Sequence, residues 1–318
     1  MTKRFRASAA AVTLGLGVSL LAAGCGKYSY GSLVAQKAFK EANDKYMGGN
    51  FEAAAAKYEE ALSSDPGKST VFFYLGNSYD NMFKASRIGE ADNDAYIQKA
   101  IANYTKGAEQ DPNPLMRKRS LEYLVAAYGS DKLNDPSQAE PLVQRMIQLE
   151  PNEPSNYFVL SKIYEDAGRY EEAEAALLKG RDTKPNDPAV FAAVSGYYNR
   201  QGDFPKTMEA LQKAAELDPT NPQGHQLVAV YYWEKAAKDH RLPIPQKKEY
   251  IMKGIEATDR ALALNKDYVD ALTYKNILLR MEGNEEKDMA RRNELYKEAD
   301  VLRNRAIDLN KKKASGVS

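Results

Sequence analysis

One recurring segment constrains the fold of this chain more than any other feature of its sequence. Five copies end in proline: "YEEALSSDP", "YTKGAEQDP", "QRMIQLEP", "LKGRDTKP" and "LQKAAELDP", at Pro66, Pro112, Pro151, Pro185 and Pro219. The step from Pro151 to Pro185 equals the step from Pro185 to Pro219. A fixed period of about 34 residues, which both steps have, is typical of stacked helical hairpins, in which each repeat packs on its neighbours.

Two later segments, "RALALNK" and "RAIDLNK", have Lys266 and Lys311 in the place of the proline, which makes seven units. When the units are aligned on this place, the position twelve residues earlier is always small: Ala54, Ala100, Ala139, Ala173, Thr207, Gly254 and Ala299. A second position is small in six of seven units: Ala61, Gly107, Met146, Gly180, Ala214, Ala261 and Ala306. Small side chains at fixed places predict helices that approach closely.

The two most regular units are "YFVLSKIYEDAGRYEEAEAALLKG" and "FAAVSGYYNRQGDFPKTMEALQKA". With a glycine at Gly168 or Gly202 and an aromatic residue at Tyr170 or Phe204, they resemble the tetratricopeptide repeat. The resemblance implies an all-α fold, a right-handed α-solenoid of about seven helix-turn-helix units over residues 34–311. These units end near residues 66, 112, 151, 185, 219, 266 and 311, and a polar tail follows over 312–318.

Some steps between units are longer than this period, which indicates insertions. In the second unit the extra segment lies at about 82–95, and in the sixth at about 234–247, where Pro243 and Pro245 prevent a continuous helix. Insertions map to loops or helix extensions, so these two are either added functional elements or ordinary solvated loops.

The segment from Met1 to Cys25 has the layout of a secretory signal. Met1–Arg6 contains three basic residues, Ala7–Leu21 is apolar but shorter than the roughly 20 residues of a membrane span, and small residues follow up to Gly24. Cys25, the only cysteine, comes directly after them. The segment "LAAGC" resembles the lipobox of a bacterial lipoprotein precursor. An uncleaved anchor and a plain secreted protein are the alternatives.

The lipoprotein resemblance implies cleavage between Gly24 and Cys25 and attachment of lipid to the Cys25 sulfur, with residues 25–33 as a short tether. Two or more acyl chains hold a protein durably on a membrane. Because Gly26 is not aspartate, the sorting rule of proteobacteria implies the periplasmic face of the outer membrane, or the cell-surface membrane in a host without an outer membrane.

The composition and the motifs argue against several kinds of activity. With 45 basic and 44 acidic residues, the chain lacks the basic excess typical of nucleic-acid binding. Gly67-Lys68-Ser69 lacks the spacing of a phosphate-binding loop, and the acidic run Glu90–Asp94 lacks the glycine and distal glutamate of a calcium loop. We therefore expect no catalytic site, no metal and no cofactor. His225 falls at a place where other units have apolar residues, which favours a packing role.

In the resembling family, the first helices of the repeats line a groove that binds peptides. Carrying these places over unit by unit selects Gln36, Phe39, Asn43, Tyr46, Phe73, Asn77, Asp80, Arg119, Glu122, Phe158, Lys162, Glu165, Asn199, Gln223, Gln226, Trp233, Thr273 and Arg280. Aromatic anchors mixed with amides suit peptide recognition, although each aromatic residue could instead pack within the solenoid.

These features predict a non-enzymatic, lipid-anchored scaffold that binds an envelope protein or peptide segment. The alternatives are a carrier or transport accessory that holds a small molecule, sugar or lipid in the groove, and an enzyme whose active site lies within the insertions. The sequence indicates neither the partner nor the oligomeric state.

Overall fold

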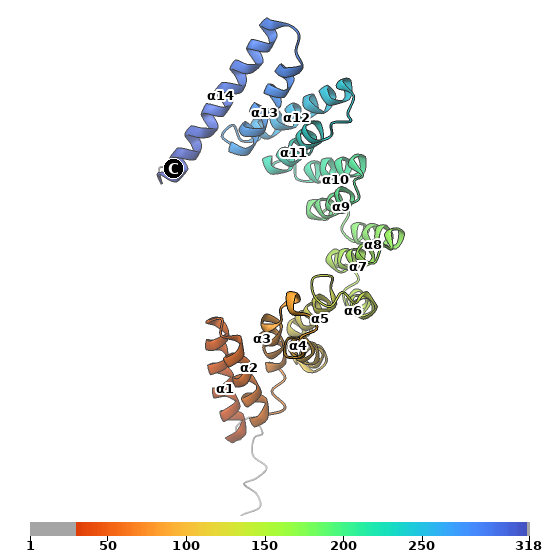
Figure 1. Cartoon of the computed structure of the whole chain (residues 1–318), viewed down its shortest axis with the longest axis vertical. Coiled ribbons are helices and arrows are strands. Elements are labelled where there is room, and N and C mark those ends of the chain that lie inside the picture. The colour runs from red at the N-terminus through yellow and green to blue at the C-terminus, as the bar shows by residue number, and fades with distance from the viewer. Residues whose placement is uncertain (1–29, 317–318) are drawn as a thin grey trace, which may run out of the picture. The chain divides into compact units, whose positions relative to one another are not determined.

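The computed structural model describes residues 30–316 of the 318-residue chain (Figure 1). Within this range the chain forms fourteen α-helices and no β-strand, so the predicted all-α class is confirmed. The signal at residues 1–24 and Cys25 lie outside the described residues. Two compact units are present, the first ending at Met146 and the second beginning at Ile147. In a helical solenoid each repeat contacts only its neighbours, so contacts within such a chain are local.

The first unit contains two and a half helical pairs and most of a sixth helix. Its helices are α1 (Tyr30–Met47), α2 (Phe51–Ser64), α3 (Val71–Met82), α4 (Ala91–Gln110), α5 (Pro114–Tyr128) and α6 (Pro136–Leu149), the last of which extends past the unit boundary. Helix α1 packs on α2 and α3 on α4, while α3 also contacts α2 and α5. Helix α3 is therefore enclosed from several sides.

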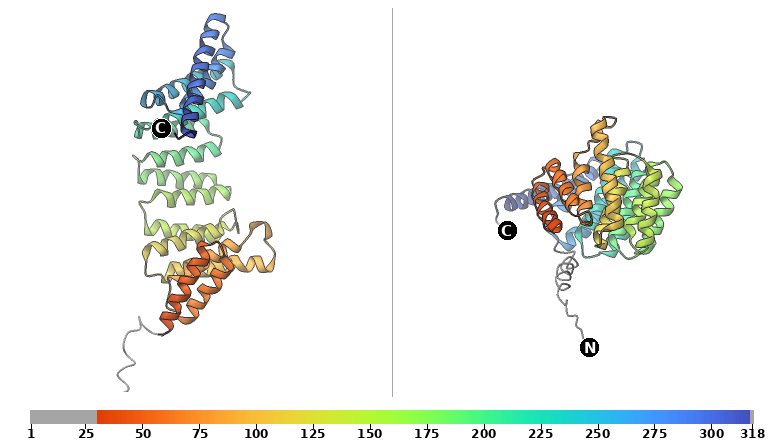
Figure 2. Two further views of the ribbon diagram at one scale, coloured as in Figure 1. Left: turned by 90° about the vertical axis from the view of Figure 1, so that its left-hand side faces the viewer. Right: turned by 90° about the horizontal axis from the view of Figure 1, so that it is seen from below.

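The second unit contains four helical pairs. They are α7 (Pro154–Asp166) with α8 (Tyr170–Thr183), α9 (Pro188–Arg200) with α10 (Phe204–Leu217), α11 (Pro222–Lys238) with α12 (Ile244–Leu264), and α13 (Val269–Glu285) with α14 (Met289–Ala314). Figure 2 shows α7 to α10, drawn in green, as successive stacked layers. Each pair also packs on the next one along the unit.

Several of these helices begin with the same short pattern, in which an Asn or Asp cap is followed by proline. Asn113, Asp187 and Asn221 each accept a hydrogen bond from a backbone N–H of the first turn, and a proline follows at the first helical position. The side-chain cap satisfies an unpaired donor, and the proline has the helical φ already fixed. These helix-starting prolines, Pro114, Pro188 and Pro222, each lie two or three residues after a repeating proline of the sequence.

The small aligned residues lie where helices meet. Ala54, Ala100, Ala173 and Ala299 are fully buried, as are Ala61 and Ala261 in the second aligned set. A side chain at Gly180 would come within 2.8 Å of the Phe158 ring. The close helix approach predicted from these positions is confirmed.

The two insertions have different structures. In the second repeat, which belongs to the first unit, a short 3₁₀ turn at Ala85–Arg87 precedes α4, which is lengthened to 20 residues. Buried Asn93 donates hydrogen bonds to the carbonyls of Lys84 and Arg87, while both Asp94 oxygens accept from the Gly89 N–H. Asp94, in the acidic run Glu90–Asp94, therefore stabilises the loop that precedes α4. In the sixth repeat, α11 ends at Lys238 and α12 starts directly after Pro243, which confirms the predicted helix break.

The last helix runs slightly past Lys311, near which the last unit was expected to end. Helix α14 continues through Lys311 to Ala314, so the expected polar tail begins as helix. Lys311, Lys312 and Lys313 stand in the last turn, where cations interact favourably with the helix dipole. Over residues 30–316, no helix has both the length and the apolar character needed to cross a membrane.

Candidate functional site

The predicted groove residues differ widely in how much of each side chain solvent reaches. Six are exposed: Gln36, Arg119, Glu122, Lys162, Asn199 and Gln223. Ten are half-buried: Phe39, Asn43, Tyr46, Asp80, Phe158, Glu165, Gln226, Trp233, Thr273 and Arg280. Phe73 and Asn77 are each 5% exposed and belong to the core. Gly24 and Cys25 lie outside the described residues.

Aromatic side chains connect the first helices of the first unit. The rings of Phe39 and Tyr46 on α1 both meet Tyr74 on α3, at centroid distances of 6.0 and 6.1 Å. Phe73 contacts Tyr74 at 5.3 Å and Tyr123 on α5 at 5.2 Å. All four contacts are edge-to-face, the geometry that aromatic pairs prefer. We call Phe39, Tyr46, Phe73, Tyr74 and Tyr123 the aromatic strip.

Phe73 is the covered middle of this strip and not an accessible anchor, which corrects its expected role. Its helix, α3, packs on α2, α4 and α5 at once and therefore buries eight of its 12 residues. Tyr123 is the accessible member, at 38% exposure. The sequence reasoning missed Tyr123, although it stands four residues after Arg119 and therefore on the same helix face.

A buried polar network underlies the strip. The Tyr46 hydroxyl donates to Asn77 Oδ1 at 2.5 Å, Asn77 Nδ2 donates to the Tyr104 hydroxyl at 3.3 Å, and Tyr104 donates to Asp80 at 3.1 Å. Lys132 forms an ion pair with Asp80. Burial, and then the charge of Asp80, raises the pKa of Tyr104, so its hydroxyl keeps its proton.

This network uses the hydrogen-bonding atoms of Asn77, an amide that the sequence suggested for peptide recognition. Asn77 also receives a hydrogen bond at Oδ1 from Asn81, so its polar atoms serve the protein itself. Asn43 similarly accepts from the Tyr58 hydroxyl at 2.7 Å. Satisfied buried networks hold their members in one arrangement. The polar residues thus form a fixed floor beneath the aromatic rings.

Cationic groups border the strip. Lys68 Nζ lies 5.4 Å from the centroid of the Phe39 ring and donates to Gln36 at 2.7 Å. Arg119 is exposed on α5. Lys68 belongs to the Gly67-Lys68-Ser69 turn between α2 and α3, where the Gly67 N–H donates to Asp65. That segment is an inter-repeat turn, as the sequence indicated.

Several groove residues predicted in the second unit contact other side chains of that unit. Glu165 accepts hydrogen bonds from Arg200 at 2.9 Å and from Gln201 at 3.0 Å. The Trp233 ring lies edge-on to Tyr274 at 5.3 Å, and Phe158 packs against Gly180. No aromatic surface comparable to the strip joins these residues in the contacts of the second unit's described residues.

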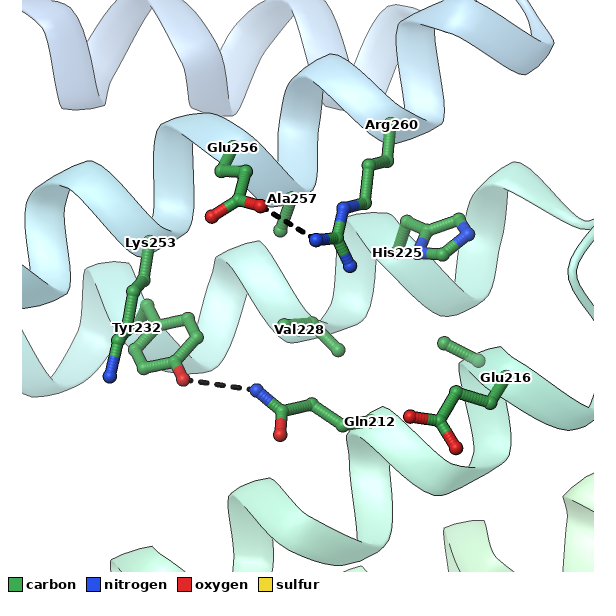
Figure 3. A pocket seen from close by; sticks show the side chains of 10 residues that line it. Gln212, Glu216, His225, Val228, Tyr232, Lys253, Glu256, Ala257 and Arg260 are labelled. Atoms are coloured by element: carbon green, nitrogen blue, oxygen red, sulfur yellow. Dashed lines mark hydrogen bonds and ion pairs between the residues drawn. The ribbon is translucent and has the colours of Figure 1, made fainter.

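The sequence favours a packing role for His225, and the structure places its side chain in the lining of a cleft. His225 is half-buried and lines a cleft of about 370 Å³ between α10 and α12, with α11 as its floor (Figure 3). Glu216 stands on one wall, and Arg260, paired with Glu256 at 2.6 Å, stands on the other. Burial, followed by the charge of Arg260, lowers the pKa of His225, so the imidazole is neutral at pH 7.

A cleft of about 590 Å³ repeats this arrangement one unit earlier, between α8 and α10. Phe191, Val194 and Tyr198 occupy the places of His225, Val228 and Tyr232. The clefts therefore follow from the packing of successive repeats. Across residues 30–316, no three His, Cys, Asp or Glu side chains gather closely enough to hold a metal ion.

Two protein families match parts of the chain. Residues 132–195 match the family described as tetratricopeptide repeat. Residues 30–151 match the family described as plant-specific mitochondrial import receptor subunit TOM20. Among curated proteins, none matches the sequence.

Several solved structures resemble the chain. The C-terminal part of a TPR repeat-containing protein from Cytophaga hutchinsonii is 18% identical, with a TM-score of 0.53 and coverage of 85% of this chain and 98% of that chain. YrrB, described as a TPR protein with an unusual peptide-binding site, is 20% identical, with a TM-score of 0.39 and coverage of 58% and 87%. A fragment of MamA from Desulfovibrio magneticus is 17% identical, with a TM-score of 0.44 and coverage of 58% and 95%. At this identity the Cytophaga structure supports a helical solenoid fold.

Proposed function

We propose, from the premise that this chain carries tetratricopeptide repeats, that it is a scaffold that binds a segment of a partner protein along the aromatic strip of its first unit. The edge-to-face contacts that carry the strip across α1, α3 and α5 are the observation that supports this surface best. Aromatic side chains on a fixed support are the residues that most often dominate binding energy.

The partial burial of the strip matters for its role. Phe39, Tyr46 and Tyr74 are half-buried, so their rings are held in place while part of each surface remains open. A partner's apolar side chain can cover that surface without the protein first having to order its own side chains. This lowers the entropic cost of association.

We further propose that Cys25 carries a lipid anchor and that the chain works in an envelope assembly, on the periplasmic face of the outer membrane. The basic, apolar and small-residue segments that end at Cys25 support this proposal. Replacement of the Cys25 sulfur by the oxygen of serine (Cys25→Ser) should move the protein from the membrane fraction to the soluble fraction. Membrane association that is unchanged in this variant would contradict the anchor but not the binding surface.

The alternative function, a carrier that holds a small molecule, sugar or lipid, has less support from the α8–α10 and α10–α12 clefts. Small-molecule sites are mostly apolar with a few polar groups. The α10–α12 cleft instead presents Glu216, Lys253, Glu256 and Arg260, and the α8–α10 cleft also has charged walls. We also propose that the chain is not an enzyme, because the sequence contains no recognisable nucleophile, metal or cofactor motif.

Truncation of Tyr123 tests the proposed surface. Tyr123→Ala should reduce recovery of the crosslinked partner from intact cells, with an affinity loss of about tenfold if Tyr123 is a binding anchor. Tyr170→Ala is the matched control, because Tyr170 is a similarly exposed tyrosine on α8, at 56%. Equal recovery from both variants would show that the partner binds elsewhere.

A further inference from the structure

The insertion of the sixth repeat forms one wall of a cleft. Helices α9 and α11 begin at equivalent prolines, Pro188 and Pro222, but α9 has 13 residues and α11 has 17. The extra turn and the loop after it face the α9–α10 turn at Gly202 across a cleft of about 500 Å³. The insertion is therefore a wall of a recess and not a loop that projects alone into solvent.

Aromatic and cationic groups line this recess, which we call the insertion cleft. Phe204 and Tyr231 are half-buried along it, and Asn199, one of the predicted groove residues, lies at its edge. Lys235, Lys238 and Arg241 come from the added turn and loop. Lys235 Nζ lies 5.4 Å from the centroid of the Phe204 ring. The cleft thus places positive charge beside aromatic surface.

Asp239 binds two of the cations of the cleft, Lys235 and Arg241. Its carboxylate accepts hydrogen bonds from Lys235 Nζ at 2.9 Å and from Arg241 Nε and backbone N–H at 3.2 and 3.1 Å. The Asp239 side chain is only 16% exposed, whereas that of Arg241 is 92% exposed. Because this contact uses Nε, the two Nη groups of Arg241 are available to a further acceptor.

The charges of the cleft do not cancel. Lys235, Lys238 and Arg241 face only two acids, Asp239 and Glu234, and the latter is paired with Lys238. The surplus cation is the exposed guanidinium, whose planar geometry suits a carboxylate. Its neighbours Phe204 and Tyr231 suit an apolar side chain adjacent in sequence to that carboxylate. A broad anionic surface would instead bring its charges close to Glu234 and Asp239.

We propose that the insertion cleft binds an acidic segment of a partner protein, with a carboxylate at Arg241 and Lys238 and an apolar side chain against Phe204 and Tyr231. This inference rests on the proposed function as a protein-binding scaffold and gives it a second contact with its own specificity. Electrostatic complementarity of this kind contributes to partner choice and to the rate of association.

The test uses the purified full chain and a fluorescein-labelled decapeptide in which Asp and Glu alternate with Phe. Fluorescence anisotropy should show binding that weakens as NaCl rises from 0.05 to 0.5 M (about a threefold fall in Debye length). The double variant Lys238→Glu, Arg241→Glu should weaken binding by roughly tenfold or more, since two exposed charge contacts become repulsive. Far-UV circular dichroism checks that the variant remains folded.

The matched control is Arg181→Glu, Lys213→Glu, which makes the same change in net charge on the α8–α10 cleft of the same unit. It should change the affinity for the peptide by less than about twofold, the scale of a remote exposed charge. Equal weakening by both double variants would mean that net charge alone attracts the peptide and would overturn the proposal. Equal affinity for a decapeptide with Lys in place of Asp and Glu would overturn it too.

Two further results separate this proposal from the one on the aromatic strip. Tyr123→Ala should leave acidic-peptide binding unchanged, because Tyr123 belongs to the first unit. If the peptide does not bind, while Tyr123→Ala still impairs partner capture, the insertion cleft is rejected and the strip stands. If the chain binds vesicles of anionic phosphatidylglycerol through Arg241 but does not bind the peptide, the occupant is a membrane and the proposal is wrong.

Discussion

At the scale of single residues, Gly107 shows how the repeat positions set the distance between helices. A Cβ placed on Gly107 in α4 would lie 2.5 Å from Ser120 Oγ on α5. Gly107→Ala should therefore destabilise the first unit by about 1–3 kcal/mol through overpacking. The gain from alanine in a helix interior, about 0.5–1 kcal/mol, does not offset this cost. Urea unfolding of the full chain measures the difference.

Ser120→Ala provides the control for the Gly107 prediction. Removal of the Ser120 hydroxyl leaves its Cβ, which would be 3.3 Å from the new methyl group. The double variant should recover more than half of the stability lost by Gly107→Ala, because contacting residues are energetically coupled. Strictly additive effects would show that Ser120 is not the obstacle.

The lowered pKa of His225 predicts how the stability of the protein changes with pH. Its pKa is lowered in the folded protein from the ordinary value of 6.5, so below about pH 6.5 the unfolded chain binds the proton more readily than the folded one. Its contribution to stability is therefore present above pH 6.5 and is lost as pH falls through 6.5 toward the folded pKa. His225→Phe, which restores the residue type of Phe191, should reduce the loss of stability between pH 7.5 and pH 5.

The measurement for His225 is the urea midpoint of each protein at the two pH values. The wild-type midpoint should fall further than that of His225→Phe. Arg260 and Glu256 on α12 and Glu216 on α10 line the same cleft and are present in both proteins. Equal falls would mean that His225 is as accessible to protons in the folded protein as in the unfolded chain.

Residue-level prediction from the sequence succeeded for small residues and failed for some larger ones. The alanines at fixed positions were correct because helix contact excludes any bulky group in every repeat. Phe73 and His225 were assigned by equivalence between units, but burial depends on the neighbours of each particular repeat. Phe73 is covered because Tyr123 and Tyr104 are large, whereas His225 is half-buried in a cleft that Arg260 also lines.

At the scale of helices, α14 differs from the second helices of the other pairs. Eight residues before the aligned end, those helices bury Tyr58, Tyr104, Val143, Leu177, Leu211 and Thr258. Helix α14 has exposed Arg303 at the same place, paired with Asp300 at 3.1 Å. A terminal repeat needs a polar outer face to remain soluble, and Arg303 provides one.

Arg303→Leu should therefore increase self-association of the purified chain, which sedimentation velocity would detect as a concentration-dependent larger species. Arg291→Leu is the matched control, since Arg291 is an exposed, paired arginine in the first turn of the same helix. The association of Arg291→Leu should match that of the wild type. If both variants associate equally, general surface apolarity, and not the repeat position, is responsible.

Helix existence and most boundaries were predictable from the sequence, because prolines and Asx caps mark where pairs begin. The end of α14 was not predictable in this way. Lys311 aligns with a proline, but lysine can continue a helix, and no helix breaker follows before Gly316. The sequence indicated an insertion at about 234–247, whereas the cleft that it forms with the α9–α10 turn depends on side chains that only the fold brings together.

At the scale of the whole molecule, the fold class followed from one period and seven aligned ends. The candidate binding surface did not, because it depends on which rings meet across α1, α3 and α5. Tyr74 and Tyr123 were not selected from the sequence, yet they connect the predicted Phe39 and Tyr46 into one strip. Equivalence between repeats indicates which helices line a surface, but side-chain contacts determine what that surface offers.

The most direct test of the account is crosslinking in living cells with a photoreactive phenylalanine placed at Tyr123 or at Gln98. Tyr123 belongs to the aromatic strip, whereas Gln98 is an exposed residue on α4 that the strip does not include. The account predicts a dominant crosslinked protein from position 123 and none from position 98. A crosslinked partner from position 98, with none from position 123, would contradict it.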